Sequence, residues 1–75
     1  MGERMTLRVV GQDVKYIEVR KKLTINNIKA IIKREMNYKT DYITIIHKGR
    51  ELVGSKQLAD SGLEEGEAIE IKWHQ

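Results

Sequence analysis

The side chains that could perform covalent chemistry in this chain are few and far apart. A hydroxyl nucleophile needs a base within hydrogen-bond reach, and the two serines, Ser55 and Ser61, both fall in predicted turns. Asp60 is the only acid next to either serine, and no histidine is placed in the sequence to join them. We therefore expect that the chain is not an enzyme.

Metal binding requires several ligands that converge on one point. The chain has no cysteine and two histidines, His47 and His74, which are expected on different strands and on opposite faces. Without cysteine, disulfides and thiolate metal sites are impossible, and such a composition is typical of an intracellular protein. We expect no metal ion and no cofactor.

Length and composition predict one small domain that spans residues 1–75, with residues 1–4 outside its folded part. Hydrophobic residues make up 40% of the chain and charged residues 33%, which is typical of a soluble globular protein. The first residues of the sequence contain no apolar run that could serve as a signal peptide, and no later apolar run approaches the roughly 20 residues that a membrane span needs. We expect an intracellular monomer that does not bind membranes. The net charge of +3 slightly favours acidic partners.

The first half of the chain has the periodicity of two strands followed by a helix. Residues 5–10 and 14–20 alternate around a turn at residues 11–13, which predicts a hairpin with one buried face. After Thr24, the expected N-cap, apolar residues recur at steps of three and four, the spacing of one helical stripe. This stripe consists of Ile25, Ile28, Ile32 and Met36. We expect the helix to end near Asn37.

The second half predicts two further strands, one helical turn and a final strand. Residues 42–47 form a strand in which burial of Ile43 and Ile45 makes Ile46 point to the other face. Residues 51–53 have the pattern of a brief strand, and residues 58–61 that of a helical turn closed by Gly62. In the last strand, Ile69, Ile71 and Trp73 are expected to face inward and Glu70, Lys72 and His74 outward.

The order of these elements resembles the ubiquitin-like β-grasp family over nearly the whole chain. Thr24-Ile25 followed by Asn27-Ile28-Lys29-Ala30 looks like the start of the ubiquitin helix. The stretch from Lys48-Gly49-Arg50-Glu51-Leu52 through Leu58, Asp60, Leu63, Ile69 and Ile71 matches the family without a gap. The resemblance implies an α+β fold with a mixed sheet of four to five strands. Its first and last strands run parallel at the centre, one helix lies across its concave face, and one short helical turn follows.

The resemblance implies two kinds of function. Modifiers similar to ubiquitin end in a flexible Gly-Gly whose carboxylate is activated and transferred, whereas here His74 and Gln75 follow Trp73. The sequence as given therefore favours a domain of a larger protein that binds partners without conjugation. A precursor or truncated modifier is the alternative.

Non-covalent docking in similar proteins uses the open face of the sheet around an outward isoleucine, which Ile46 matches. Lys72 and Glu70 stand where ubiquitin has an outward valine and histidine, and the turn at residues 11–13 lacks the usual apolar residue. We therefore expect a basic face around one apolar residue. Its predicted partner-binding residues are Arg8, Ile46, Lys48, Arg50, Lys72 and His74.

The expected partner is a protein with an acidic or mixed surface. Nucleic acid is a weaker alternative, because sheets that read single strands stack bases on outward aromatics, and the predicted outward positions are arginine, lysine and isoleucine. A basic face that is simply solvated is a further interpretation. Trp73 is interpreted as a lid over the core rather than a stacking platform.

Overall fold

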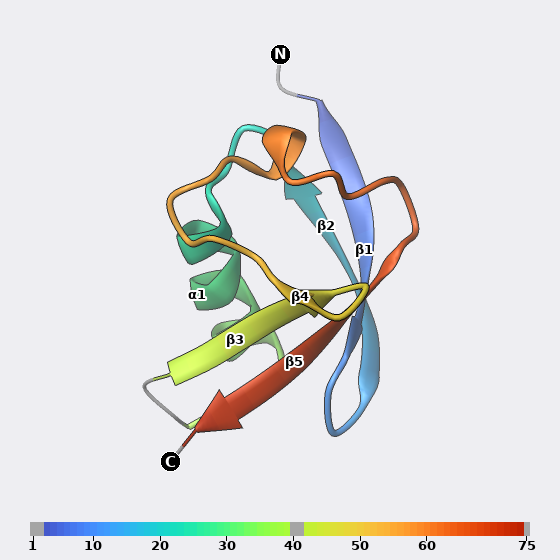
Figure 1. Cartoon of the computed structure of the whole chain (residues 1–75). Helices are drawn as coiled ribbons and strands as arrows, with labels where there is room; N and C mark the ends of the chain where they lie inside the picture. Colours follow the sequence, from blue (N-terminus) through green and yellow to red (C-terminus); the bar gives the residue numbers. More distant parts are fainter. Residues whose placement is uncertain (1–2, 40–41, 75) are drawn as a thin grey trace.

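The chain forms five strands, one α-helix and one short 3-10 helix. The structure is a computed structural model that describes residues 3–39 and 42–74, and for His74 only the backbone. The elements in chain order are β1 (Arg4–Val10), β2 (Val14–Arg20), α1 (Ile25–Glu35), β3 (Tyr42–His47), β4 (Arg50–Glu51), the 3-10 helix (Leu58–Asp60) and β5 (Ala68–His74) (Figure 1).

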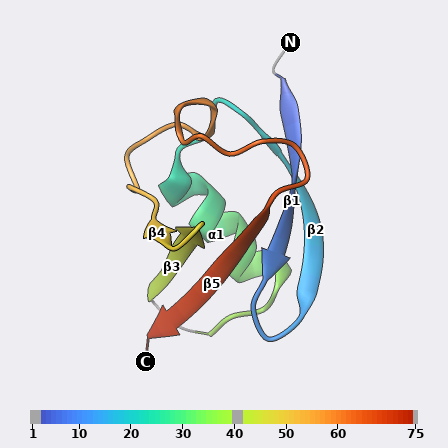
Figure 2. The ribbon, with the colours of Figure 1, turned by 45° about the vertical axis from the view of Figure 1, so that its right-hand side comes forward.

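The five strands form one mixed sheet in the order β2-β1-β5-β3-β4. Strands β1 and β5 run parallel at its centre, and the other neighbouring strands are antiparallel. Helix α1 lies across one face of this sheet (Figure 2). The predicted α+β fold, with its parallel central strands, single helix and short helical turn, is confirmed.

Helix α1 begins at a capping box that the sequence predicted in part. The Thr24 hydroxyl accepts a hydrogen bond from the backbone N–H of Asn27 (3.2 Å), and the Asn27 side-chain oxygen accepts one from the N–H of Thr24 (3.1 Å). These bonds satisfy two of the donors that a helix start leaves without partners. The helix ends at Glu35, and Asn37 reverses the chain with a left-handed backbone (φ 58°).

The core lies between α1 and the sheet. The predicted helical stripe supplies Ile25, Ile28 and Ile32, each at most 1% exposed, while Met36 is half-buried at its end. Full burial of an isoleucine contributes about 1.5–3 kcal/mol, so these three side chains account for much of the attraction between helix and sheet. The remaining buried apolar residues are Met5, Leu7, Val9, Ile17, Val19, Ile43, Ile45, Leu52, Leu58, Leu63, Ile69 and Ile71.

Two expectations need correction: where the folded part of the chain begins, and which residues form the brief strand. Arg4, expected outside the fold, is the first residue of β1, and the backbone oxygen of Glu3 accepts a hydrogen bond from the N–H of Lys21 (2.9 Å). The other two residues of that expectation, 1 and 2, lie outside the described part. The brief strand begins at Arg50 and is two residues long, because the chain turns away from the sheet and leaves Val53 61% exposed.

Candidate functional site

Ile46 lies on the side of the sheet that faces away from α1, here called the outer face. On β3 the buried Ile43 and Ile45 alternate with the half-buried Ile46, as the sequence pattern predicted. In the register of the sheet, Ile46 lies between Glu70 of β5 and Glu51 of β4. Residues directly opposite each other on antiparallel strands have Cβ atoms about 5 Å apart, so both glutamates border the isoleucine.

Arg8 and Lys72 also lie on the outer face. Arg8 is exposed on β1, between Tyr16 of β2 and Ala68 of β5 in the register. Lys72 is exposed on β5 and lies opposite Thr44 of β3. Three of the six residues predicted for this face are therefore brought together on it, namely Arg8, Ile46 and Lys72.

Lys48 lies in the turn between β3 and β4, and Arg50 is the first residue of β4, so neither lies on the outer face on which we expected them. Strand β3 ends at His47, and Lys48 has a left-handed backbone (φ 52°), so the alternation of the strand does not continue. Arg50 lies opposite the buried His47, which places its side chain on the inner side, and Glu51 takes the outward position. The side chain of His74 lies outside the described residues.

The outer face is mixed in charge rather than basic as we expected. Glu51 and Glu70 border Ile46 because the strand register turns these acids outward. Farther along β1 and β2, Arg4 and Glu18 form an exposed ion pair of 3.0 Å. An exposed pair of this kind is worth at most about 1 kcal/mol, so it adds little stability, but it cancels positive charge on the face.

Apolar side chains on the hairpin extend the surface around Ile46, and the sequence-based prediction missed them. Val14 and Tyr16 of β2 are 58% and 64% exposed, and Val10 of β1 lies between Val14 and Glu70 in the register. The alternation within β1 and β2 carries this signal, because outward positions follow from the buried ones. Comparison with ubiquitin had directed attention to the turn at residues 11–13 instead.

A buried histidine connects the end of β3 to the turn before β5. His47 is 9% exposed, and its Nε2 lies 2.9 Å from Oε2 of Glu67. The other carboxylate oxygen of Glu67 accepts a hydrogen bond from the backbone N–H of Glu64 (2.8 Å), and Lys48 Nζ lies 3.6 Å from Oε2. The hydrogen bond with His47, then that from Glu64, lowers the pKa of Glu67 despite the opposing effect of burial.

Ser61 and His47 line one surface hollow but are not arranged as nucleophile and base. The Ser61 hydroxyl donates to the backbone oxygen of Leu58 (2.6 Å), while the Nε2 of His47 is directed to Glu67. Across residues 3–39 and 42–74 there is no group of three or more potential metal ligands. The same residues include no helix that is long and apolar enough to cross a membrane.

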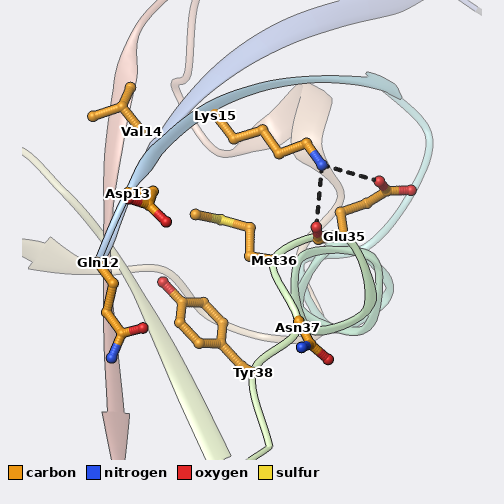
Figure 3. Close-up of a pocket in the computed structure, with 8 residues that line it drawn as sticks. All are labelled: Gln12, Asp13, Val14, Lys15, Glu35, Met36, Asn37 and Tyr38. Carbon is orange, nitrogen blue, oxygen red and sulfur yellow. Dashed lines mark hydrogen bonds and ion pairs between the residues drawn. The ribbon is translucent and has the colours of Figure 1, made fainter.

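Tyr38 and Trp73 stack their rings with centroids 5.4 Å apart. Tyr38 packs against the core, whereas Trp73 is 38% exposed. The Tyr38 hydroxyl points under the turn into a hollow of about 270 Å³ between the hairpin and the end of α1 (Figure 3). The hydroxyl is buried and has no hydrogen-bond partner among the described residues.

The mixed five-stranded sheet, the single helix across it and the open outer face define a β-grasp domain of the ubiquitin-like class. The model of the ubiquitin family matches residues 5–75. The chain therefore belongs to the ubiquitin family. A comparison with curated protein sequences found no match.

Solved structures share this fold at low sequence identity. One, described as "Molecular Mimicry of SUMO promotes DNA repair", has a TM-score of 0.88 at 13% identity and covers 96% of this chain and 94% of its own. The N-terminal ubiquitin-like domain of the 4931431F19Rik protein has a TM-score of 0.88 at 16% identity, with coverages of 100% and 79%. Ubiquitin of Caldiarchaeum subterraneum has a TM-score of 0.86 at 17% identity, with coverages of 97% and 96%. These similarities show that the fold is shared.

Proposed function

We propose that this domain binds a partner protein without covalent attachment, through the outer face of its sheet. Ile46 anchors the contact, and Val10, Val14 and Tyr16 extend it across β1 and β2. Single exposed apolar side chains are common on protein surfaces, but Val10, Val14 and Tyr16 are grouped on the paired strands β1 and β2. In the register of the sheet, Glu70 of β5 lies between this group and Ile46, so a partner that covers both also spans this glutamate. This group of apolar side chains is the observation that carries the proposal.

The charges beside these apolar residues set the chemistry of the partner. Arg8 and Lys72 attract acidic groups, whereas Glu51 and Glu70 attract basic groups. A partner surface with an apolar centre and both signs of charge around it matches this arrangement. A uniformly acidic surface would meet repulsion at the two glutamates.

The same glutamates favour a protein over a nucleic acid. Phosphate groups on a backbone that crossed the sheet near Ile46 would approach Glu51 and Glu70. Two outward tyrosines are present, Tyr16 on β2 and Tyr42 on β3, but β1 and β5 separate them. With neighbouring strands about 4.8 Å apart, the two rings are too distant for adjacent bases to stack on them. Titration with short RNA and DNA at physiological salt is expected to show no measurable binding.

Replacement of Ile46 by alanine tests the proposal. The wild-type domain and the Ile46→Ala variant serve as baits in quantitative capture, and a partner that depends on Ile46 is then purified and titrated. Loss of a central apolar anchor typically costs about 2 kcal/mol, so the dissociation constant should rise roughly thirtyfold. Tyr16→Ala is expected to have a smaller effect, because this side chain lies at the margin of the face.

Val53→Ala is the matched control, since Val53 is 61% exposed but lies beyond the end of β4. It removes a similar apolar side chain and should leave partner binding unchanged. The proposal fails if a partner binds the Ile46→Ala and Tyr16→Ala variants as tightly as it binds the wild type.

A further inference from the structure

Strand β3 has an open edge beside α1 that is separate from the outer face. Strand β5 pairs with β3 from residue 42 to residue 46, whereas β4 pairs only with Ile46 and His47. Past this short pairing, the N–H of Leu52 donates to the backbone oxygen of Ile45 (2.9 Å). The chain then leaves the sheet for the start of α1, where the oxygen of Gly54 accepts from the N–H of Asn26 (2.9 Å).

Within residues 3–39 and 42–74, the backbone of Ile43 therefore has no hydrogen-bond partner on this edge. Residues two apart in a strand direct their backbone N–H and C=O groups to the same edge of that strand. The backbone groups of Ile43 therefore point to the edge at which Ile45 bonds to Leu52. Among the described residues no hydrogen bond to the Ile43 backbone is made on that side. Its side chain, 5% exposed, stays in the core, so only the backbone is presented.

A groove of about 400 Å³ lies next to this open edge, between β3 and α1. Strand β3 contributes Tyr42, which is 71% exposed, and Ile43. Helix α1 contributes Asn26, Lys29, Ala30 and Lys33. Of the described residues that line the groove, the charged ones are the two lysines, and both are positive. Lys33 already takes part in an interaction of its own, and the charge argument therefore rests on Lys29.

We propose that this groove binds a short, extended, acidic segment of a partner protein, which pairs with the Ile43 backbone and places a carboxylate beside Lys29. The free groups of Ile43 are one backbone N–H and one backbone C=O. An extended polypeptide segment matches them best, because its own backbone offers a C=O and an N–H at the same separation. The carboxylate follows from the charge of the lining. Because one residue supplies the backbone pairing, the segment is short and its binding weak, in roughly the 0.1–1 mM range.

The test is a nuclear magnetic resonance titration of the labelled domain with the peptide acetyl-Glu-Val-Glu-Val-Glu-amide, whose central glutamate shares the α1 side of the sheet with Ile43 when the two residues pair. Amide signals of residues 42–44 and 26–30 are expected to shift together, while those of β1 and β2 stay in place. A matched peptide with lysine for glutamate tests the charge, and one with an N-methylated central glutamate tests the backbone pairing. Both should bind at least about tenfold more weakly.

Variants of the protein separate this groove from the outer face. Lys29→Glu should weaken binding of the glutamate peptide about tenfold, and Lys29→Gln by less, with the folded spectrum retained. Lys72→Glu, which makes the same charge change on the outer face, and Ile46→Ala should leave peptide binding unchanged. The inference is wrong if the lysine peptide binds equally well, if the shifts lie on β2 or the outer face, or if no signals shift at millimolar peptide. Loss of binding on Ile46→Ala would instead assign the peptide to the outer face.

Discussion

The Tyr38 side chain gains an aromatic contact but buries its hydroxyl group. Its ring stacks on Trp73, and its buried hydroxyl has no partner in the described part of the chain. A buried polar group without a partner costs about 1–3 kcal/mol, so Tyr38→Phe should leave the free energy of unfolding unchanged or raise it by about 1 kcal/mol. Urea unfolding measures this difference. A loss of more than about 1 kcal/mol would show that the hydroxyl has a partner, such as a bound water.

Substitution of Gly11 is a second test of the surroundings of the Tyr38 hydroxyl. A methyl group added at this position would overlap the Tyr38 hydroxyl. Overpacking of this kind costs about 1–3 kcal/mol, so Gly11→Ala should destabilise the domain, and part of the loss should disappear when Tyr38→Phe removes the hydroxyl. Independent, additive effects of the two substitutions would mean that they do not share this contact.

Glu67 is expected to make the stability of the domain depend on pH. Its pKa is lowered in the folded protein, chiefly by the hydrogen bond with His47 and then by that from Glu64. A lowered carboxyl pKa contributes stability that is present above the unfolded value of about 4.3 and is lost as the pH falls through the folded value. Glu67→Gln should therefore reduce the free energy of unfolding at neutral pH.

The pH profile distinguishes this contribution from a simple packing effect. The difference in unfolding free energy between wild type and Glu67→Gln should shrink as the pH falls from about 5 to about 2.5. Glu18→Gln is the control, because Glu18 pairs with Arg4 in an exposed position and should show a much smaller difference. A difference for Glu67 that stays constant over this range would contradict the linkage.

At the scale of elements, the strongest test concerns the two faces of β3. Ile45 is 1% exposed and Ile46 is half-buried on the outer face. Ile45→Ala should cost about 2–5 kcal/mol because it leaves a cavity in the core, whereas Ile46→Ala should cost about 1 kcal/mol. Thermal and urea unfolding of both variants provide the comparison. Equal losses would show that the assigned faces of β3 are wrong.

The sequence predicted the long elements well because each has a regular apolar period. The hairpin residues, the helical stripe that starts at Ile25 and the cap at Thr24 all follow from spacing and local hydrogen bonding. The face of Arg50 could not be predicted in this way, since the left-handed Lys48 breaks the alternation inside a two-residue turn. The pairing of His47 with Glu67, twenty residues apart, depends on tertiary packing and leaves no mark in the local pattern.

At the scale of the whole molecule, the net charge of +3 is small, but acidic and basic residues are unevenly distributed along the chain. Residues 57–71 contain five acids and no lysine or arginine, whereas the rest of the chain is strongly basic. This acidic stretch runs from the 3-10 helix through the turn before β5 and into the first half of β5 (Figure 1). Its last acid, Glu70, reaches the outer face beside Ile46. The acidic stretch therefore supplies one of the two glutamates that border Ile46, and Glu51 of β4 supplies the other.

This mixed character predicts how charge reversal changes association with a partner that docks on Ile46. For a partner with both signs of charge around an apolar centre, Arg8→Glu with Lys72→Glu should slow association several-fold at low salt, and so should Glu51→Lys with Glu70→Lys. Both effects should fade above about 0.15 M salt, where screening acts over roughly 8 Å. Stopped-flow association rates measure them, with Lys22→Glu plus Lys39→Glu as a control for the net charge change of the first pair. If the second pair speeds association while the first slows it, the partner surface is acidic and not mixed.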